Sequence, residues 1–156
     1  MQKNINSLAY IIGRKGITQE ELEKWQKNSN YFNSVFTTDS NGVVQYMYPL
    51  EMNGNMKPGT KIQSDLMKQA LQNRQPFISH PYLAQTGNLV LLVSAPIFDE
   101  SGNYQGVVDG TLYLKSDNAL KKFYTIISLK MGHLFLWWTN QERLFIIPMK
   151  EGSMNQ

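Results

Sequence analysis

The stretch Leu89–Leu114, LVLLVSAPIFDESGNYQGVVDGTLYL, decides the fold of this 156-residue chain. Its first segment, Leu89–Phe98, is apolar on both faces for most of its length, which is typical of a central strand buried on two sides. The polar segment Asp99–Asn103 then turns the chain, and Tyr104–Leu114 returns as a second long strand. The sequence therefore predicts a long antiparallel β-hairpin running from Asn88 to Leu114.

Shorter strands are predicted around this hairpin. Asn33–Thr38 and Val43–Tyr48 are rich in β-branched and aromatic residues, as strands are. Between them Asp39–Gly42 reads DSNG, and Asn and Gly tolerate the positive φ angles of a tight reversal. Phe77–Ser79 is predicted as a short edge strand. Strands joined by tight turns in this way indicate an antiparallel sheet.

Two helices are predicted before the first strand. The first is indicated by apolar residues at helical spacing, namely Ile5, Leu8, Ala9 and Ile12. We expect Gly13 and Gly16 to interrupt it. The second begins at the sequence Thr18–Glu21, TQEE, which is a capping box: the hydroxyl and the carboxylate three residues on each accept a free backbone amide.

A third helix is predicted to begin near Ser64 with Asp65 in its first turn, and to end before Pro76. Its predicted buried side is Ile62, Leu66, Met67, Ala70 and Leu71. After the long hairpin, Asn118–Leu129 is predicted as a helix, followed by a hairpin formed by His133–Trp138 and Arg143–Ile147. Together these elements predict an α+β fold with helices packed to one side of an antiparallel sheet.

Composition excludes several classes of function. The chain has no cysteine, so disulfides, cysteine-ligated zinc and thiol catalysis are excluded. The formal charge is +3 with scattered lysines and arginines, which provides no basic stripe for nucleic acid. No apolar run approaches the ~18–20 residues of a membrane span. Phosphate-loop and nucleophile-elbow motifs are absent, and His80 and His133 are far apart in the sequence, so we expect no enzyme, cofactor or metal site in this chain.

The hairpin also supplies the main candidate site residues. Strand periodicity places Val107, Asp109, Thr111 and Tyr113 on one face of the second long strand. A carboxylate, a hydroxyl and a phenol are more polar chemistry than a plain core face needs, which indicates a pocket wall that binds a cationic or hydroxylated ligand. The alternative is an edge position where the Asp109 carboxylate reaches water or a backbone amide.

The remaining candidates are polar or aromatic side chains near this hairpin. Ser94 and Leu92 share a face of the partner strand, and buried serine bonded to backbone is the alternative for Ser94. Each tyrosine could instead fill the core with its hydroxyl at the rim, and Arg74 at a helix C-terminus complements the helix dipole. The predicted ligand-binding set is Asp109, Thr111, Ser94, Tyr82, His80, Tyr46, Tyr48, Arg74 and Leu92.

Three segments carry a resemblance to a known family. Phe36–Val44, FTTDSNGVV, resembles the strand, D-x-x-G, strand opening of Cache domains, the extracytoplasmic PAS-like sensors of bacteria. Gly59-Thr60 with the following helix, and Gln75–Ser79, resemble their central segment. Ser94–Val108, SAPIFDESGNYQGVV, resembles their S-x-P-[VI]-x-[DN]-x-x-G-x-x-x-G-V motif, and Asp109–Leu114, DGTLYL, resembles the GGTIYL of double-Cache sensors.

The resemblance implies a domain plan. It covers about residues 1–130 and suggests a helical segment at 1–30, a Cache module at 31–117, and at 118–156 a connecting helix and hairpin that could begin a second module. It also implies a sheet carrying a ligand pocket, a long N-terminal helix that often packs in a dimer, and a position outside the cytoplasmic membrane as part of a signalling receptor. Leu8 and Ile12 could form such a dimer or cover the sheet.

The resemblance leaves the ligand open. Amino-acid-binding Cache domains carry an R-x-W-Y type motif before the long strands, and an Asp where this chain has Thr111; here Arg74–Tyr82 lacks that motif, and Asp109 lies two residues early. The expected function is therefore extracytoplasmic sensing of a small polar molecule, such as an organic acid or an amine, for a kinase or diguanylate cyclase output domain. The alternatives are a ligand-free dimerisation module and a cytosolic PAS domain that binds haem or flavin.

Overall fold

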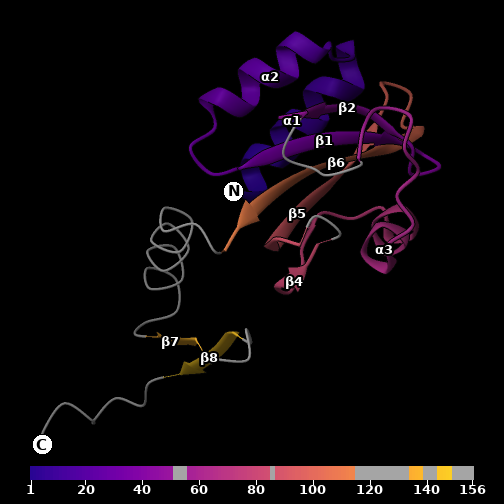
Figure 1. Cartoon of the computed structure of the whole chain (residues 1–156). Helices are drawn as coiled ribbons and strands as arrows, with labels where there is room; N and C mark the ends of the chain where they lie inside the picture. The colour runs from indigo at the N-terminus through magenta and orange to yellow at the C-terminus, as the bar shows by residue number, and fades with distance from the viewer. Residues whose placement is uncertain (51–55, 85–86, 115–133, 139–143, 149–156) are drawn as a thin grey trace, which may run out of the picture. The chain divides into compact units, whose positions relative to one another are not determined.

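The computed structural model describes residues 1–50, 56–84, 87–114, 134–138 and 144–148. The chain divides into two compact units, Met1–Leu114 and Lys115–Gln156. The first unit contains α1 (Gln2–Lys15), α2 (Gln19–Asn28), β1 (Ser34–Asp39), β2 (Val44–Tyr48), α3 (Asp65–Asn73), β3 (Phe77–Ile78), β4 (Tyr82–Leu83), β5 (Leu89–Phe98) and β6 (Tyr104–Tyr113) (Figure 1). The α+β class is thus confirmed.

The sheet of the first unit is six-stranded and antiparallel, in the order β2-β1-β6-β5-β3, with β4 also paired to β5. The predicted hairpin is confirmed as β5 and β6, which pair from Val90 opposite Tyr113 to Phe98 opposite Tyr104. β1 and β2 are confirmed close to their predicted bounds. β4 was not predicted, because its segment is short and follows Pro81.

Two aspartates build the turns of the two hairpins in the same way. The Asp99 carboxylate accepts the backbone N–H groups of Ser101 and Asn103 at 2.9 and 2.8 Å. The Asp39 carboxylate accepts those of Asn41 and Val43, both at 2.9 Å. The backbone and side-chain donors of Asn103 hold the pKa of Asp99 below its usual value. The two D-x-x-G sequences, Asp39–Gly42 and Asp99–Gly102, therefore form turns with the same pattern of hydrogen bonds.

A bulge near the β5–β6 turn changes the face on which Tyr104 lies. The register between the two strands shifts between Ile97 and Phe98, and Gly106 has a φ of 143°. A Cβ atom at Gly106 would lie 2.0 Å from the carbonyl oxygen of Thr38, so only glycine lets β1 approach this closely. As a result Tyr104 packs against the core cluster under α3.

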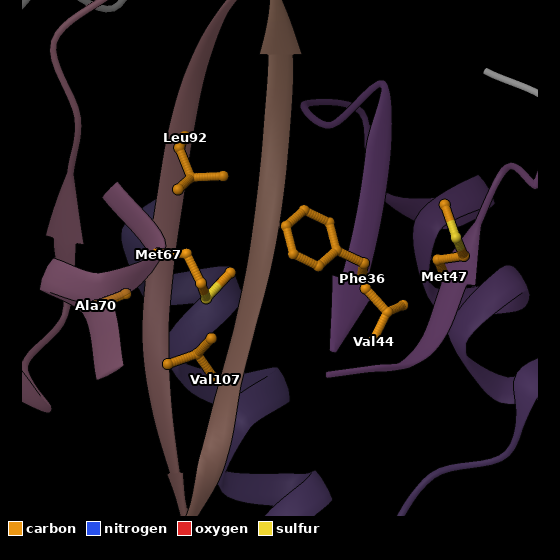
Figure 2. Close-up of a cluster of buried hydrophobic side chains, with 7 residues drawn as sticks. All are labelled: Phe36, Val44, Met47, Met67, Ala70, Leu92 and Val107. Atoms are coloured by element: carbon orange, nitrogen blue, oxygen red, sulfur yellow. The ribbon is translucent and has the colours of Figure 1, made fainter. Parts of the chain in front are cut away.

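Both faces of the sheet are covered, so the prediction of helices on one side is wrong. One face carries Phe36, Met47, Leu92 and Val107, which pack in a buried cluster with Met67 and Ala70 of α3 (Figure 2). On the opposite face, α1 packs on β5 and β6, and α2 packs on β2 and β1 (Figure 1). The sequence contained the reason, because Leu89–Phe98 is apolar on both faces and needs cover on both.

The capping box of α2 is confirmed, with Thr18 and Glu21 satisfying each other's backbone amides. The expected interruption of the first helix at Gly13 is wrong, since α1 continues to Lys15 and ends at Gly16. Gly13 instead allows α1 to lie directly on β5. Leu8, considered above for a dimer, is buried within this unit.

The second unit contains β7 (Leu134–Trp138) and β8 (Leu144–Pro148), which pair as an antiparallel two-stranded sheet. This confirms the predicted second hairpin. The helix predicted at Asn118–Leu129 lies outside the described residues.

The close packing at Gly13 predicts that replacing this helical glycine with alanine destabilises the protein. A Cβ atom there would lie 1.9 Å from the carbonyl oxygen of Phe98. Although alanine is favoured over glycine in helices by ~1 kcal/mol, we expect Gly13→Ala to lower the free energy of unfolding by about 2 kcal/mol or more, because α1 must move off β5. Urea denaturation measures this, with Ser7→Ala on the exposed side of α1 as the control. A stabilised Gly13→Ala protein would contradict the packing.

Candidate ligand-binding site

A cavity of about 450 Å³ opens on the α3 face of the sheet. Its apolar lining comes from the sheet, from α3 and from the segment before α3, and includes Phe36, Ile62, Leu66, Met67, Val90 and Leu92. Its polar lining consists of Thr60, Lys61, Ser64, Asp65, Tyr82, Thr111 and Tyr113. A mostly apolar hollow with a few polar groups is the usual form of a small-molecule site.

The wall formed by residues 57–62 is held by backbone hydrogen bonds to the first hairpin. Val44 donates its N–H to the carbonyl of Thr60 at 2.9 Å and accepts the N–H of Gly59 at 2.8 Å. Ile62 donates its N–H to Gly42 at 2.9 Å. These bonds fix Lys61 at the rim of the cavity, where its side chain is exposed and makes no ion pair with any residue that the structure describes.

The N-terminus of α3 forms the adjoining wall. The helix begins where the sequence predicted, near Ser64. Ser64 is the N-cap, and its hydroxyl accepts the N–H of Met67 at 3.2 Å. Asp65 in the first turn is exposed and pairs with Lys68 at 3.1 Å. Since Asp65 is neutralised by its own helix, Lys61 is the cavity-lining charge left without an ion-pair partner among the described residues.

The polar groups of the cavity floor are neutral donors and acceptors. The Thr111 hydroxyl is hydrogen-bonded to the buried hydroxyl of Ser34 on β1. Tyr82 lies on the wall formed by β4, and burial, with a smaller contribution from the charge of Asp109, raises the pKa of Tyr82 to about 12. The phenol therefore keeps its proton at physiological pH and can donate a hydrogen bond.

Of the predicted ligand-binding residues, Thr111, Tyr82 and Leu92 line the cavity. Tyr46 and Tyr48 pair with Thr37 and Val35, which places them on the opposite face of the sheet.

The cavity lining does not include Tyr48, His80 or Arg74. The ring centroid of Tyr48 lies 5.4 Å from the Lys27 ammonium of α2. His80 is exposed. Arg74 is the C-cap of α3 in a left-handed conformation, with its guanidinium 4.7 Å from the ring centroid of Tyr104.

Asp109 and Ser94 lie beside the cavity, beneath α3. β6 lies between β1 and β5, so the alternative that Asp109 occupies a sheet edge is wrong. Asp109 pairs with Phe36 and Ser94, is 0% exposed, and has no hydrogen-bond partner for either carboxylate oxygen among the described residues. Burial raises the pKa of Asp109 to about 7, against a smaller opposing effect of the Ser94 hydroxyl.

Several lining residues were not in the predicted set. Lys61 and Thr60 line the cavity because the segment that carries them bonds to β2, and no local pattern in the sequence indicates that long-range contact. Ser64 was predicted only as a helix cap. Tyr113 was placed on the correct strand face together with Thr111, and that alternation was the available signal.

Two features are absent from the described residues. Among the described residues no group of three or more His, Asp or Glu side chains could hold a metal ion. No helix within the described ranges is long and apolar enough to cross a membrane.

Comparison with known proteins identifies a family of sensor domains. Residues 1–113 match the family described as HK/GC/Chemotaxis protein-like, sensor domain. No curated protein matches the sequence significantly. Similar solved structures include an extracellular ligand-binding receptor of Desulfohalobium retbaense, with TM-score 0.63 and 19% identity over 83% of this chain and 24% of that one.

Two other structures resemble the chain to a similar degree. The ligand-binding domain of the Pseudomonas fluorescens chemoreceptor CtaA, in complex with L-alanine, has TM-score 0.61 and 20% identity over 94% of this chain and 62% of that one. The Escherichia coli DcuS sensor domain has TM-score 0.56 and 17% identity, covering 78% of this chain and 94% of that one. The chain thus spans less than two thirds of the receptor domains of D. retbaense and P. fluorescens.

The buried carboxyl predicts how stability depends on pH. The pKa of Asp109 is raised from 3.8 to about 7 in the folded chain, so the folded state holds this proton more tightly than the unfolded state. The contribution of Asp109 is therefore fully favourable below about pH 4 and is lost as the pH rises to about 7. We expect Asp109→Asn to become more stable relative to wild type over this range, by up to about 4 kcal/mol.

Urea denaturation between pH 4.5 and pH 8.5 measures this difference. Asp99→Asn is the control: the pKa of Asp99 is lowered, so its contribution is lost only toward acid pH and its difference from wild type should stay level. An equally level difference for Asp109→Asn would show that Asp109 is not an unpaired buried carboxyl.

Proposed function

Because the chain belongs to the family of HK/GC/Chemotaxis protein-like sensor domains, we propose that it is the ligand-binding input domain of a bacterial membrane receptor, with a small organic carboxylate as its ligand. The observation that carries the proposal is the cavity on the α3 face, which combines an apolar lining with Lys61 and the α3 N-terminus at its rim. We also propose that the sensor lies outside the cytoplasmic membrane and that the receptor carries an output domain.

The charges around the cavity support a carboxylate. Lys61 is cationic and unpaired among the described residues, and the first-turn amides of α3 add partial positive charge beside it. Tyr82 stays protonated and donates a hydrogen bond. One end of the ligand should therefore carry negative charge, while Phe36 and Leu92 contact an apolar body.

An amine is less well supported by the same surroundings. Asp65 is exposed and pairs with Lys68, and Asp109 does not line the cavity. A ligand ammonium group would therefore find no buried carboxylate in contact with it. Some of the structural relatives are complexes with amino acids, including CtaA with L-alanine and the Pseudomonas aeruginosa receptor PctC with GABA. Those ligands share the carboxylate that we propose here.

A second candidate function is dimerisation without a ligand. Tyr10 and Ile11 on α1 are 63% and 40% exposed, which leaves a small apolar surface on the side of the helix away from the sheet. A dimer through α1 would use these residues, because Leu8 and Ala9 are already buried in the core. Light scattering of Tyr10→Ser and wild type separates this candidate from a monomeric sensor.

The carboxylate proposal is tested with matched ligands. Thermal shift and calorimetry would compare acids, the amides of the same acids, and amines of the same carbon skeleton. We expect an acid to raise the melting temperature and to bind about tenfold or more tightly than its amide, because only the acid can form a charge-assisted contact with Lys61.

Two lysine variants sharpen the test. Lys61→Gln should remove most of the preference for the acid over the amide, whereas Lys15→Gln, which changes an exposed lysine of α1 that does not line the cavity, should keep it. Tighter binding of an amine than of its matching acid would contradict the proposed ligand class. No stabilisation by any member of the panel would contradict binding in this cavity.

A further inference from the structure

The structure contains a buried ionisable group for which the cavity provides no function. Asp109 lies at the centre of the sheet, 0% exposed, and both of its carboxylate oxygens lack a hydrogen-bond partner among the described residues. The hydroxyl of Ser94, which pairs with Asp109 across β5 and β6, also lacks one, as does the buried hydroxyl of Tyr104. Unsatisfied buried polar groups are rare in folded proteins and call for an explanation.

The surroundings of Asp109 limit the access of water to the α3 face of the sheet. Its strand is held between β1 and β5 by continuous pairing. The opposite face of β6 at Gly110 is closed, because a Cβ atom there would lie 2.5 Å from the ring of Phe32. On its own face Asp109 is paired with Phe36 of β1. Phe36 belongs to the buried cluster that also contains Leu92, Val107 and the α3 residues Met67 and Ala70 (Figure 2). Hydration of the carboxylate therefore requires part of this cover, which includes α3, to move.

α3 is a short element of the cover over Asp109, and its movement should cost little free energy. It has nine residues, of which only Met67 and Ala70 are buried. Helices this short depend on tertiary packing for their stability. The long central hairpin beneath it, in contrast, is held by ladder hydrogen bonds along its length.

The charged and titratable groups around Asp109 do not neutralise it. On the elements packed against it, β1 and β5 present Phe36 and Ser94, and β3 presents Phe77. β4 presents Tyr82 and β6 presents Tyr104, and both phenols have pKa values raised by burial.

The charged side chains of α3 are turned to other partners. Lys68 pairs with the exposed Asp65, and Arg74 at the C-cap lies over the ring of Tyr104. No cation among the described residues therefore forms an ion pair with Asp109.

We propose that Asp109, Ser94 and α3 form a proton switch: α3 packs on the sheet when Asp109 is neutral and separates from it when Asp109 is ionised. The neutral carboxyl can donate its O–H to a neighbouring acceptor such as Ser94 and remain in an apolar cluster. The ionised carboxylate must be hydrated, and with it the hydroxyls of Ser94 and Tyr104 gain water.

The switch reaches the ligand cavity through α3 itself. Leu66 and Met67 line the cavity, and Met67 also covers the cluster around Asp109. Separation of α3 therefore removes one wall of the cavity. This regulatory step rests on the proposed ligand-binding function, whereas the movement of α3 does not. A ligand that contacts Met67 should favour the packed form and so the protonated carboxyl, by thermodynamic reciprocity.

The sign of the pH effect follows from the raised pKa of Asp109. The packed form binds the proton up to about pH 7, whereas the carboxylate of the open form loses it near the ordinary value of 3.8. Packing of α3 is thus strongest below about pH 4, weakens as the pH rises to about 7, and is level above that.

Hydrogen exchange of the ligand-free chain tests the movement. After correction for intrinsic exchange rates, the protection of the α3 amides should fall about tenfold per pH unit between pH 5 and pH 7, and then level off. The opening free energy of the α3 amides should stay below that of the most protected β5 and β6 amides, which exchange only on global unfolding, and α3 in Asp109→Asn should show no such pH dependence. The carboxyl carbon resonance of Asp109 in the wild-type chain should titrate near pH 7, which needs no variant.

The possible results distinguish a failure of the proton switch from a failure of the proposed ligand. The switch would be overturned by α3 protection that does not change with pH, by α3 amides that are as protected as those of β5 and β6, or by the same loss in Asp109→Asn. In a second arm, an acid that binds through Lys61 should bind about tenfold more weakly at pH 8 than at pH 5.5 in wild type but not in Asp109→Asn. If no acid binds while α3 still shows the expected exchange, the proposed ligand fails and the switch stands.

Discussion

The pairing of β5 with β6 is the interaction on which the rest of the molecule depends. Its register places Thr111 opposite Leu92 in the cavity floor and Asp109 opposite Ser94 beneath α3. β1 pairs with the other side of β6, and β3 and β4 pair with the other side of β5. A shift of one residue would turn every one of these side chains to the opposite face, so the register fixes both the cavity and the buried carboxyl.

The two faces of the sheet differ in how tightly they are packed. On one face α1 lies directly on β5 at Gly13, with Ile5, Leu8 and Ala9 buried. On the other face the short α3 shares its cover with a cavity, and an unpaired carboxyl lies underneath. Stability is therefore concentrated on the face without the buried carboxyl. The face that carries the cavity retains the freedom that the proposed sensing function needs.

Local patterns in the sequence predicted most of the fold and part of the site. The central hairpin, the D-x-x-G turns and both helix caps follow from neighbouring residues, and alternation placed Thr111 correctly. The sequence could not reveal that Tyr104 reaches the α3 face through a bulge, because that depends on the approach of β1 to Gly106. Nor could it place Lys61, whose position depends on bonds between separate segments.

The segment that carries Lys61 has a further consequence, for the behaviour of the protein in concentrated solution. β2 is the last strand on its side of the sheet, and strands in that position tend to pair with other chains. Here the Val44 amide and carbonyl are occupied by Thr60 and Gly59, and the Met47 carbonyl accepts the side-chain amide of Gln19. The rim of the binding cavity thus also protects the sheet from aggregation, and variation in this segment would change solubility together with recognition.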